Sequence, residues 1–471
     1  MHMLSGCILG SERPELAVDI PPAYRNAGPK PYAALPTYEW WRGFRSRELT
    51  AMIDEAQQAN LDIAAAVGRI LQADAQARLA GAALLPSLDL DADATRTRSS
   101  RTMGPGGSPS GGRGPSERVS YRASLAASFE IDFWGKNRAA LRAAEENAVA
   151  FRFDREVVHL STTAGVANGY FQVLAAQDRL RVARGNEASA TRILNLIKQR
   201  LEAGTASELD TAQQESVVAT QRAAIPPLEQ QLRQNIHALA VLLGRPPEFF
   251  GLRGGSMNQI AIPRITPGLP SDVLAQRPDI RAAEASLASA NADVESARAA
   301  FFPTISLTGQ GGYQSAALRT LFRPESLFYN VAAGLTQPIF DGGRLLADLD
   351  LQRGRQEELL QLYRKVIVQS FADVENALVA VQQTERRERL QRDVVSASRK
   401  AFDISESRLR EGTIDLVTLL NTQQSLFQAE DALAQARLAH LLAIVSLYQA
   451  LGGSWIADLP AVSPAVIRTA G

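Results

Sequence analysis

The chain contains one cysteine, Cys7, and four histidines among its 471 residues. A single cysteine excludes an intrachain disulfide and a zinc site with several cysteine ligands. The 50 Lys and Arg residues balance the 50 Asp and Glu residues, so no net charge attracts the chain to nucleic acid or anionic lipid. No apolar run reaches the roughly 18 residues of a membrane-spanning helix. A transmembrane β-barrel stays compatible with the sequence, because its alternating strands keep the hydropathy low.

Signals of catalysis are absent as well. None of the four histidines has a carboxylate or a cysteine at metal-ligand spacing. The glycine-rich tract 104–114 lacks the Lys-Ser/Thr of a phosphate-binding loop, and the chain has no Gly-x-Ser-x-Gly nucleophile elbow. We therefore expect no enzyme activity, no cofactor and no metal.

Internal repetition dominates what is present. The Arg-Leu and Gly-Thr pairs of residues 200–205 recur 208 positions later in residues 408–413, and the Leu-Gly pair at 243–244 recurs at 451–452. Such self-similarity indicates one supersecondary unit written twice. The predicted domains are a truncated signal with a lipobox (1–7), an extended N-terminal arm (8–50), repeat 1 (51–247), a linker (248–270), repeat 2 (271–455) and a C-terminal tail (456–471).

Each repeat contains a predicted β-hairpin, over 87–133 in repeat 1 and over 304–340 in repeat 2. In residues 119–133 apolar side chains take the odd positions and mostly polar ones the even positions, which is the period of a strand. The strands reach about ten residues, as membrane strands do. Four strands cannot close a barrel, and open edges in a membrane leave backbone groups unpaired. Two chains would supply eight strands and three chains twelve, and the pattern alone does not choose.

Long helices account for most of the remaining chain. Aromatic residues make up only 6% of the sequence, a composition typical of long helices and coiled coils. The proline-free stretches 135–203 and 343–411 predict two helices, each about 100 Å long. Apolar residues at seven-residue spacing from Leu420 to Tyr448 predict core packing. Shorter helices are expected over 51–84, 205–243 (kinked at Pro226-Pro227), 271–300 and 413–451.

The N-terminus has the form of a bacterial lipobox. Residues 4–7 read Leu-Ser-Gly-Cys, a pattern in which Cys7 is lipidated and becomes the mature N-terminus. Only six residues precede Cys7, too few for the charged and apolar segments of a signal peptide. Either the true start lies upstream or Cys7 is an ordinary thiol.

Five segments of the repeats also carry a family likeness, and they follow one another in the family's order along nearly the whole chain. They are 130–135 (EIDFWG), 242–247 (LLGRPP), 276–284 (QRPDIRAAE), 301–303 (FFP) and 338–343 (PIFDGG). On these segments the chain resembles the TolC-like outer-membrane factors, and especially their lipoprotein branch with the OprM- and NodT-type efflux proteins.

The resemblance implies an α+β membrane protein. Three chains, with four strands each, would form a 12-stranded outer-membrane β-barrel continuous with a 12-helix periplasmic α-barrel. The homotrimer would passively conduct drugs or other exported small molecules from a periplasmic adaptor protein and an inner-membrane efflux transporter to the exterior. It would need no cofactor, sit in outer-membrane lipid and extend into the periplasm. Cys7 would be its lipid anchor, and Ile8 after the cysteine fits sorting to the outer membrane.

The resemblance also locates a gate at the tip of the helical hairpins. In the family, a constriction of Asp residues and polar contacts between neighbouring helices closes the tunnel until the adaptor engages it. Two acidic residues near the tip turns, Asp210 and Asp415, could supply such a ring. The turns themselves are marked by Gly204, Thr205, Gly412 and Thr413.

Four gate positions of the family carry neutral residues in this chain. The family's Leu-Asp-Ala-Gln-Arg reads Leu-Asn-Thr-Gln-Gln at 420–424, so Asn421 replaces the carboxylate and Gln424 replaces the arginine. Thr418 stands at another acidic position, and Leu409 at a frequent tyrosine. Three amides attract cations more weakly than three carboxylates. We expect a tunnel that is less cation-selective and less tightly latched than those of its relatives.

Two other interpretations stay open. Within the same family, the chain could serve protein (type I) secretion or metal export instead of drug efflux. From a different class, it could be a soluble coiled-coil scaffold whose hairpins only dimerise. A scaffold has no reason to expose Tyr121, Leu125 and Phe129 to lipid.

Overall fold

The computed structural model describes residues 20–26, 39–98, 117–263 and 270–453. These residues divide into two compact units. Unit 1 contains Ile70–Ala150 and Ala283–Leu362, and unit 2 contains the other described residues. The units do not follow the two repeats, because each unit takes residues from both.

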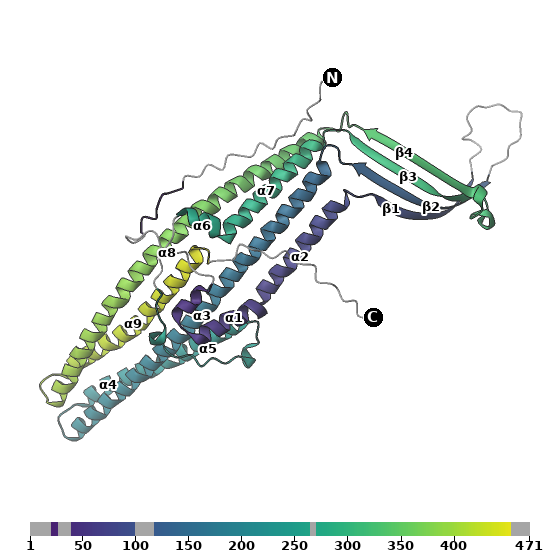
Figure 1. The fold of residues 1–471 in the computed structure, drawn as a ribbon. Helices are drawn as coiled ribbons and strands as arrows, with labels where there is room; N and C mark the ends of the chain where they lie inside the picture. The colour runs from purple at the N-terminus through teal and green to yellow at the C-terminus, as the bar shows by residue number, and fades with distance from the viewer. Residues whose placement is uncertain (1–19, 27–38, 99–116, 264–269, 454–471) are drawn as a thin grey trace, which may run out of the picture. The chain divides into compact units, whose positions relative to one another are not determined.

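Unit 1 is built on a four-stranded antiparallel sheet (Figure 1). The strands lie in chain order, so β1 and β4 are its two edges. Their bounds are Ser87–Arg98 (β1), Glu117–Ile131 (β2), Thr304–Ser315 (β3) and Leu327–Thr336 (β4).

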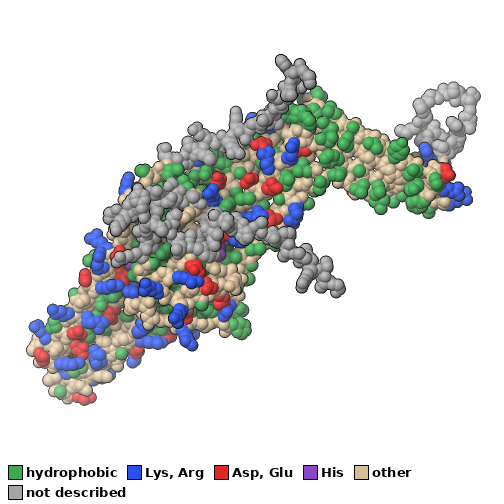
Figure 2. All heavy atoms as spheres, viewed as in Figure 1, with side chains coloured by type: hydrophobic (Ala, Val, Ile, Leu, Met, Phe, Trp, Pro, Cys, Tyr) green, Lys and Arg blue, Asp and Glu red, His purple; other side chains and the backbone are tan. Residues whose placement is uncertain are grey.

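The register separates an apolar face from a polar one. Leu90 lies opposite Leu125, which lies opposite Gly311, and Gly311 lies opposite Tyr329. The neighbouring row is polar on β1 and β2, where Asp91 lies opposite Ser124. Tyr329 is 83% exposed, and hydrophobic side chains gather over the strands in Figure 2. The sheet therefore presents a large exposed apolar surface, which in proteins marks a binding or membrane-facing surface.

Nine helices belong to the described residues, together with short 3-10 turns. They are α1 (Arg47–Ala59), α2 (Leu61–Ala82), α3 (Lys136–Glu202), α4 (Glu208–Ala223), α5 (Ile225–Leu242), α6 (Pro270–Gln276), α7 (Pro278–Ala299), α8 (Arg344–Arg410) and α9 (Leu416–Ala450). None of these helices has a stretch apolar enough to cross a membrane. The 67-residue helices α3 and α8 agree with the two proline-free stretches of the sequence.

The prediction of an extended arm up to residue 50 is wrong at its end. Trp40–Phe44 form a 3-10 turn whose aromatic side chains are buried, and α1 begins at Arg47. The Ser46 side chain accepts a hydrogen bond from the backbone of Leu49 and so caps α1. Burial of the aromatic rings in unit 2 decides the conformation of this segment, and local composition does not show it.

The predicted single helices 51–84 and 271–300 are each two helices. The first breaks at Asn60, between α1 and α2, and the second breaks at Arg277, between α6 and α7. Helix 205–243 breaks at Ala224, and Pro226 then occupies the first turn of α5. Proline is tolerated in a first turn, so the expected interruption by Pro226-Pro227 is confirmed.

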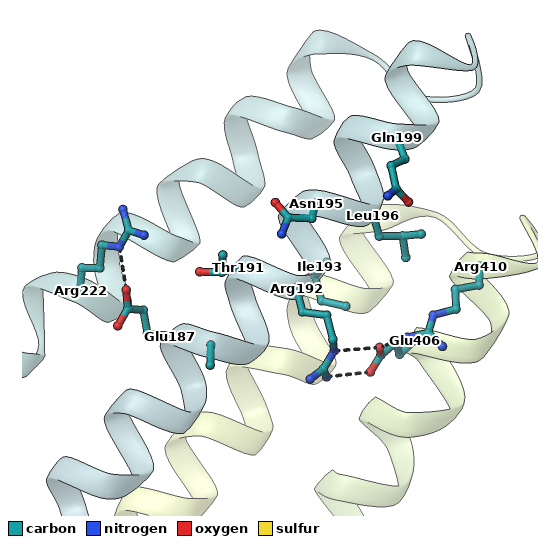
Figure 3. Close-up of a pocket in the computed structure, with 11 residues that line it drawn as sticks. Glu187, Thr191, Arg192, Ile193, Asn195, Leu196, Gln199, Arg222, Glu406 and Arg410 are labelled. Carbon is teal, nitrogen blue, oxygen red and sulfur yellow. Dashed lines mark hydrogen bonds and ion pairs between the residues drawn. The ribbon is translucent and has the colours of Figure 1, made fainter.

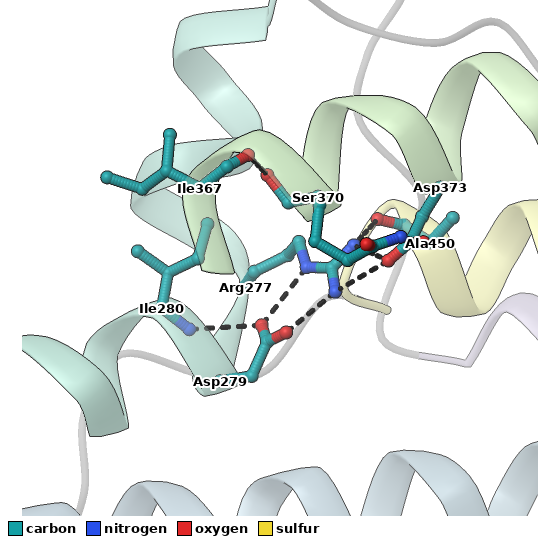
Figure 4. Close-up of polar contacts among 8 residues, drawn as sticks. Arg277, Asp279, Ile280, Ile367, Ser370, Asp373 and Ala450 are labelled. Carbon is teal, nitrogen blue, oxygen red and sulfur yellow. Dashed lines mark hydrogen bonds and ion pairs between the residues drawn. The ribbon is translucent and has the colours of Figure 1, made fainter. Parts of the chain in front are cut away.

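At both breaks that the sequence did not predict, a side chain donates a hydrogen bond to a carbonyl at the end of another helix. At the first break, the Asn60 amide donates to the carbonyl of Leu242 at the end of α5, 2.7 Å away. At the second, the Arg277 guanidinium donates to the carbonyl of Ala450 at the end of α9, 3.1 Å away (Figure 4). Each side chain thus satisfies a carbonyl that the helix end leaves without an intrahelical partner.

Arg277 is further held by two carboxylates. Its Nη2 lies 2.6 Å from an Asp279 oxygen, and its Nη1 lies 3.2 Å from Asp373 on α8. These two partners raise the pKa of Arg277 although burial of the guanidinium lowers it. The Arg-Pro-Asp segment of repeat 2 therefore joins α6, α7, α8 and α9 within unit 2.

The apolar residues at seven-residue spacing on α9 lie in the core of unit 2. Leu441 and Tyr448 pack with Trp40, Phe44 and Phe171 in one cluster. A second cluster, which we call the tip cluster, lies between the α3–α4 and α8–α9 hairpins. Its buried members are Ala190, Ile193, Ile197, Val218, Phe402, Leu409, Leu416, Leu419, Leu426 and Phe427. The expected core role of the apolar residues at seven-residue spacing is confirmed.

Candidate functional site

The two hairpin turns of unit 2 have the same backbone geometry. Gly204 has a φ of 71° and Gly412 a φ of 74°, a left-handed conformation that favours glycine. The amide of Thr205 donates to the Arg200 carbonyl, 2.8 Å away, and the amide of Thr413 donates to that of Arg408, 2.9 Å away. These are the bonds of a Schellman motif, which ends a helix by satisfying its last carbonyls.

The two acidic residues near the turns cap helices. The Asp210 carboxylate accepts from the backbone of Ser207, 2.7 Å away, while the Ser207 hydroxyl accepts from the backbone of Asp210. Asp415 accepts from the backbone of Thr418, 2.8 Å away, at the start of α9. The hydrogen bonds from Thr418 lower the pKa of Asp415, so this carboxylate stays ionised at neutral pH. Both carboxylates are oriented toward their own helices, and a ring role for them stays a prediction.

Three of the neutral gate positions share one exposed face of α9. Thr418, Asn421 and Gln424 are all exposed and follow one another at three-residue spacing. Residues three apart on a helix are neighbours on its surface. The structure thus brings these three predicted site residues together into an uncharged polar stripe.

Leu409 differs from the other predicted gate residues, because its side chain is buried in the tip cluster. Its carbonyl oxygen accepts a hydrogen bond from the Arg200 guanidinium, 2.6 Å away. This bond ties the end of α8 to the end of α3. Sequence reasoning noticed Arg200 as a repeated residue but did not assign it this contact.

A polar groove of about 730 Å³ lies on the α3 side of the hairpins (Figure 3). The Arg192 guanidinium reaches across it to the Glu406 carboxylate on α8, 3.3 Å away, and Arg410 approaches the same carboxylate to 2.5 Å. On α4, Arg222 lies 2.7 Å from Glu187. No repeat or family motif pointed to these ion pairs. Arg192 and Glu406 are 214 residues apart in the sequence, whereas Arg410 and Glu406 are neighbours on α8. Eight of its eleven lining residues carry polar or charged side chains.

A buried charge cluster joins α8 and α9 farther from the turns. The Glu388 carboxylate is 4% exposed and lies 2.7 Å from His440 Nδ1 and 3.3 Å from Arg437. Arg392 pairs with the same carboxylate. Burial raises the pKa of Glu388, but the His440 hydrogen bond and the two arginines outweigh it, so the pKa lies below its usual value.

This cluster predicts a pH dependence of stability. Because the folded pKa of Glu388 is lowered, its contribution is complete above the ordinary value of 4.5 and is lost as pH falls through the folded value. Glu388→Gln leaves Arg437 without its buried charge partner, so we expect a loss of about 3 kcal/mol at neutral pH. Thermal unfolding of both proteins in one detergent, from about pH 7 down to about pH 3, measures the effect. The wild-type advantage should shrink in acid, whereas a constant difference would contradict the prediction.

Two further expectations from the sequence concern Cys7 and a metal site. Cys7 lies outside the described residues. Among the described residues, no three His, Cys, Asp or Glu side chains are placed to hold a metal ion.

Residues 52–245 and 269–453 match the family described as Outer membrane efflux protein. The sequence is 42% identical over 421 residues to the pyoverdine export outer membrane protein OpmQ of Pseudomonas aeruginosa, covering 89% of this chain and 88% of the relative. It is 32% identical to the outer membrane protein OprJ of the same species, covering 90% and 88%.

Solved structures agree with this likeness. The outer-membrane channel OprN superposes with a TM-score of 0.86 at 27% identity, covering 94% of this chain and 98% of that one. The open state of the Neisseria gonorrhoeae MtrE outer membrane channel superposes with a TM-score of 0.82 at 28% identity, covering 94% and 97%.

These findings confirm the TolC-like fold, with four strands per chain, long periplasmic helices and two repeats. They set aside the soluble scaffold, and they agree with a passive conduit that is not an enzyme. The chain belongs to the outer membrane efflux protein family and is an outer-membrane channel component of an efflux pump.

Proposed function

We propose that three copies of the chain close a 12-stranded barrel in the outer membrane, continuous with a 12-helix periplasmic tunnel. The observation that carries the proposal is the sheet of unit 1, whose edge strands β1 and β4 each lack a neighbour on one side among the described residues. An open edge is unfavourable in lipid, and pairing of β1 with β4 of the next copy removes every edge. The exposed apolar face then meets lipid, and the polar face lines the channel.

The mass of the detergent-extracted particle tests the assembly. A species near three times the 50.9 kDa chain, recovered from the outer-membrane fraction, is expected. A monomer or a dimer from the same fraction would contradict the shared barrel.

The channel works with a periplasmic adaptor protein and an inner-membrane efflux transporter, which supplies the energy. The polar groove around Arg192 and Glu406 supports this part of the proposal, because it offers an adaptor helix charged and polar contacts near the tip. The adaptor opens the tip, and the channel itself needs no cofactor.

The exported compounds are of the pyoverdine class. Two relatives named for pyoverdine export are 42% and 41% identical to the chain, whereas relatives named for toluene efflux are 30% to 33% identical. In a strain that lacks its own pyoverdine channel, the protein should restore pyoverdine in the medium. Restored solvent tolerance without pyoverdine in the medium would identify solvents instead, and restored protein secretion or metal tolerance would favour those alternatives.

Cys7 anchors the chain to the outer membrane through lipid. The lipobox Leu-Ser-Gly-Cys at 4–7 supports this assignment. Cys7→Ala should lose the mass of the lipid and leave less protein in the outer membrane. Intact-mass measurement of both purified proteins checks the first effect, and a difference no larger than the sulfur atom that the substitution removes would show that Cys7 is not lipidated.

The uncharged stripe of α9 forms the gate. Because Asn421 is exposed there between Thr418 and Gln424, the closed tunnel has no carboxylate ring at this level. Asn421→Asp places one carboxylate per chain on the stripe and should increase the preference for cations. Reversal potentials in a salt gradient across planar bilayers measure the change. Strong cation selectivity of the wild type, or no change in Asn421→Asp, would contradict this gate.

A further inference from the structure

Two glutamines meet inside the tip of unit 2. Gln214 lies on α4, Gln423 lies on α9, and both side chains are completely buried. Their neighbours along the helices, Val218 and Leu419, belong to the tip cluster. The pair therefore lies where the α3–α4 hairpin packs on the α8–α9 hairpin.

The two amides are only partly satisfied by the protein. Gln214 Nε2 donates to the Ala190 carbonyl, 2.9 Å away, and to Gln423 Oε1, 3.4 Å away. The second distance exceeds the usual range for N–H···O bonds. Gln214 Oε1 and Gln423 Nε2 have no hydrogen-bond partner among the described residues.

Turning the Gln214 amide does not repair the pair. Its oxygen would then face the carbonyl oxygen of Ala190, and the bond of 2.9 Å would be lost. At the contact between the hairpins, the acceptor Gln214 Oε1 and the donor Gln423 Nε2 therefore lack a hydrogen-bond partner among the described residues. A buried polar group without a partner destabilises the packed state, because the same group is hydrogen-bonded when water reaches it.

The other polar contacts between the hairpins are of the opposite kind. Arg200 donates to the Leu409 carbonyl, 2.6 Å away, and Arg192 pairs with Glu406, so these contacts favour packing. The repeat does not explain the glutamine pair either. The residue related to Gln214 is Thr422, whose hydroxyl donates to a carbonyl of its own helix.

We propose that the Gln214–Gln423 pair is a release point that weakens the packing between the two hairpins of one chain and thereby sets how readily the tip opens. This inference rests on the proposed channel function, in which the tip is the gate. Separation of the hairpins exposes both amides to water and removes the penalty. The arginine contacts stabilise the packing between the two hairpins, and the glutamine pair lowers the free energy needed to separate them.

The double variant Gln214→Leu/Gln423→Leu tests the proposal, with Gln213→Leu on α4 as the matched control. Hydrogen–deuterium exchange of the purified assembly is read over α4 and the first half of α9. Removal of both unpaired groups should slow exchange there by about tenfold and leave the control unchanged. In planar bilayers the open fraction of the double variant should fall. Faster or unchanged exchange in the folded double variant would overturn the proposal.

The exchange measurement does not depend on conduction, so the two proposals fail separately. A wild type that does not conduct, with slowed exchange in the double variant, would refute the channel gate but keep the release point. If the double variant does not fold, Gln423→Met is measured in the same way, because methionine removes the unpaired donor and fills irregular space in a core. Unchanged exchange in Gln423→Met would then overturn the release point.

Discussion

Leu125→Lys is expected to abolish assembly of the protein in the outer membrane. Leu125 is half exposed in the middle of β2, on the apolar face between Leu90 and Gly311. In the proposed barrel this face meets lipid. A lysine at the bilayer midplane costs about 2–4 kcal/mol per chain, and three chains carry it at once. Outer-membrane fractionation and the yield of detergent-extracted trimer measure the effect.

Ser128→Lys is the matched control on the same strand. Ser128 is exposed, and it lies three residues from Leu125, so its side chain belongs to the polar face. This variant should assemble with nearly the wild-type yield, because its lysine faces water in the channel. Equal yields of both variants would mean that the apolar face does not meet lipid.

Gly244→Ala is expected to destabilise unit 2 strongly. Gly244 ends α5 with a φ of 68°, and a Cβ atom there would lie 2.4 Å from the carbonyl oxygen of Ala59. The left-handed conformation alone costs an alanine about 1–2 kcal/mol, and the overlap adds about 1–3 kcal/mol. The contact lies beside the break at Asn60, so relief of the overlap has to move α1 or α5. Thermal unfolding in detergent, at one scan rate, should show a much lower midpoint.

Gly204→Ala separates the two contributions. Gly204 has almost the same φ of 71° and ends α3 in the same kind of motif, but no atom lies within 4 Å of the position that an alanine methyl group would take there. Only the conformational cost of about 1–2 kcal/mol is then expected. If Gly244→Ala and Gly204→Ala lower the midpoint equally, the close approach to Ala59 contributes nothing to stability.

The local patterns of the sequence predicted the elements that depend on near neighbours. Alternation in residues 119–133 predicted β2, and the absence of proline predicted α3 and α8 almost to the residue. The repeated Gly-Thr pairs predicted both hairpin turns. Such features follow from side-chain period and backbone freedom, which are properties of a short stretch of chain.

Where the structure departs from these patterns, contacts between residues distant in the sequence determine it. At the break at Asn60, the side-chain oxygen caps α2 locally while the amide donates to the distant carbonyl of Leu242. Burial of Trp40 and Phe44 folds a segment expected to be extended. The carboxylates of Asp210 and Asp415 accept hydrogen bonds that cap helices. The positions of these residues near the turns did not predict these bonds.

The sequence by itself thus determined the two repeats, the strands and long helices, the family and the neutral residues of the uncharged stripe on α9. Only the tertiary structure decided the distant partners of Asn60 and Arg277, the ion pairs across the polar groove and the partly satisfied pair of Gln214 and Gln423. The physical reason is distance along the chain. The two glutamines are 209 residues apart, and their meeting depends on how two hairpins pack, which no local pattern records.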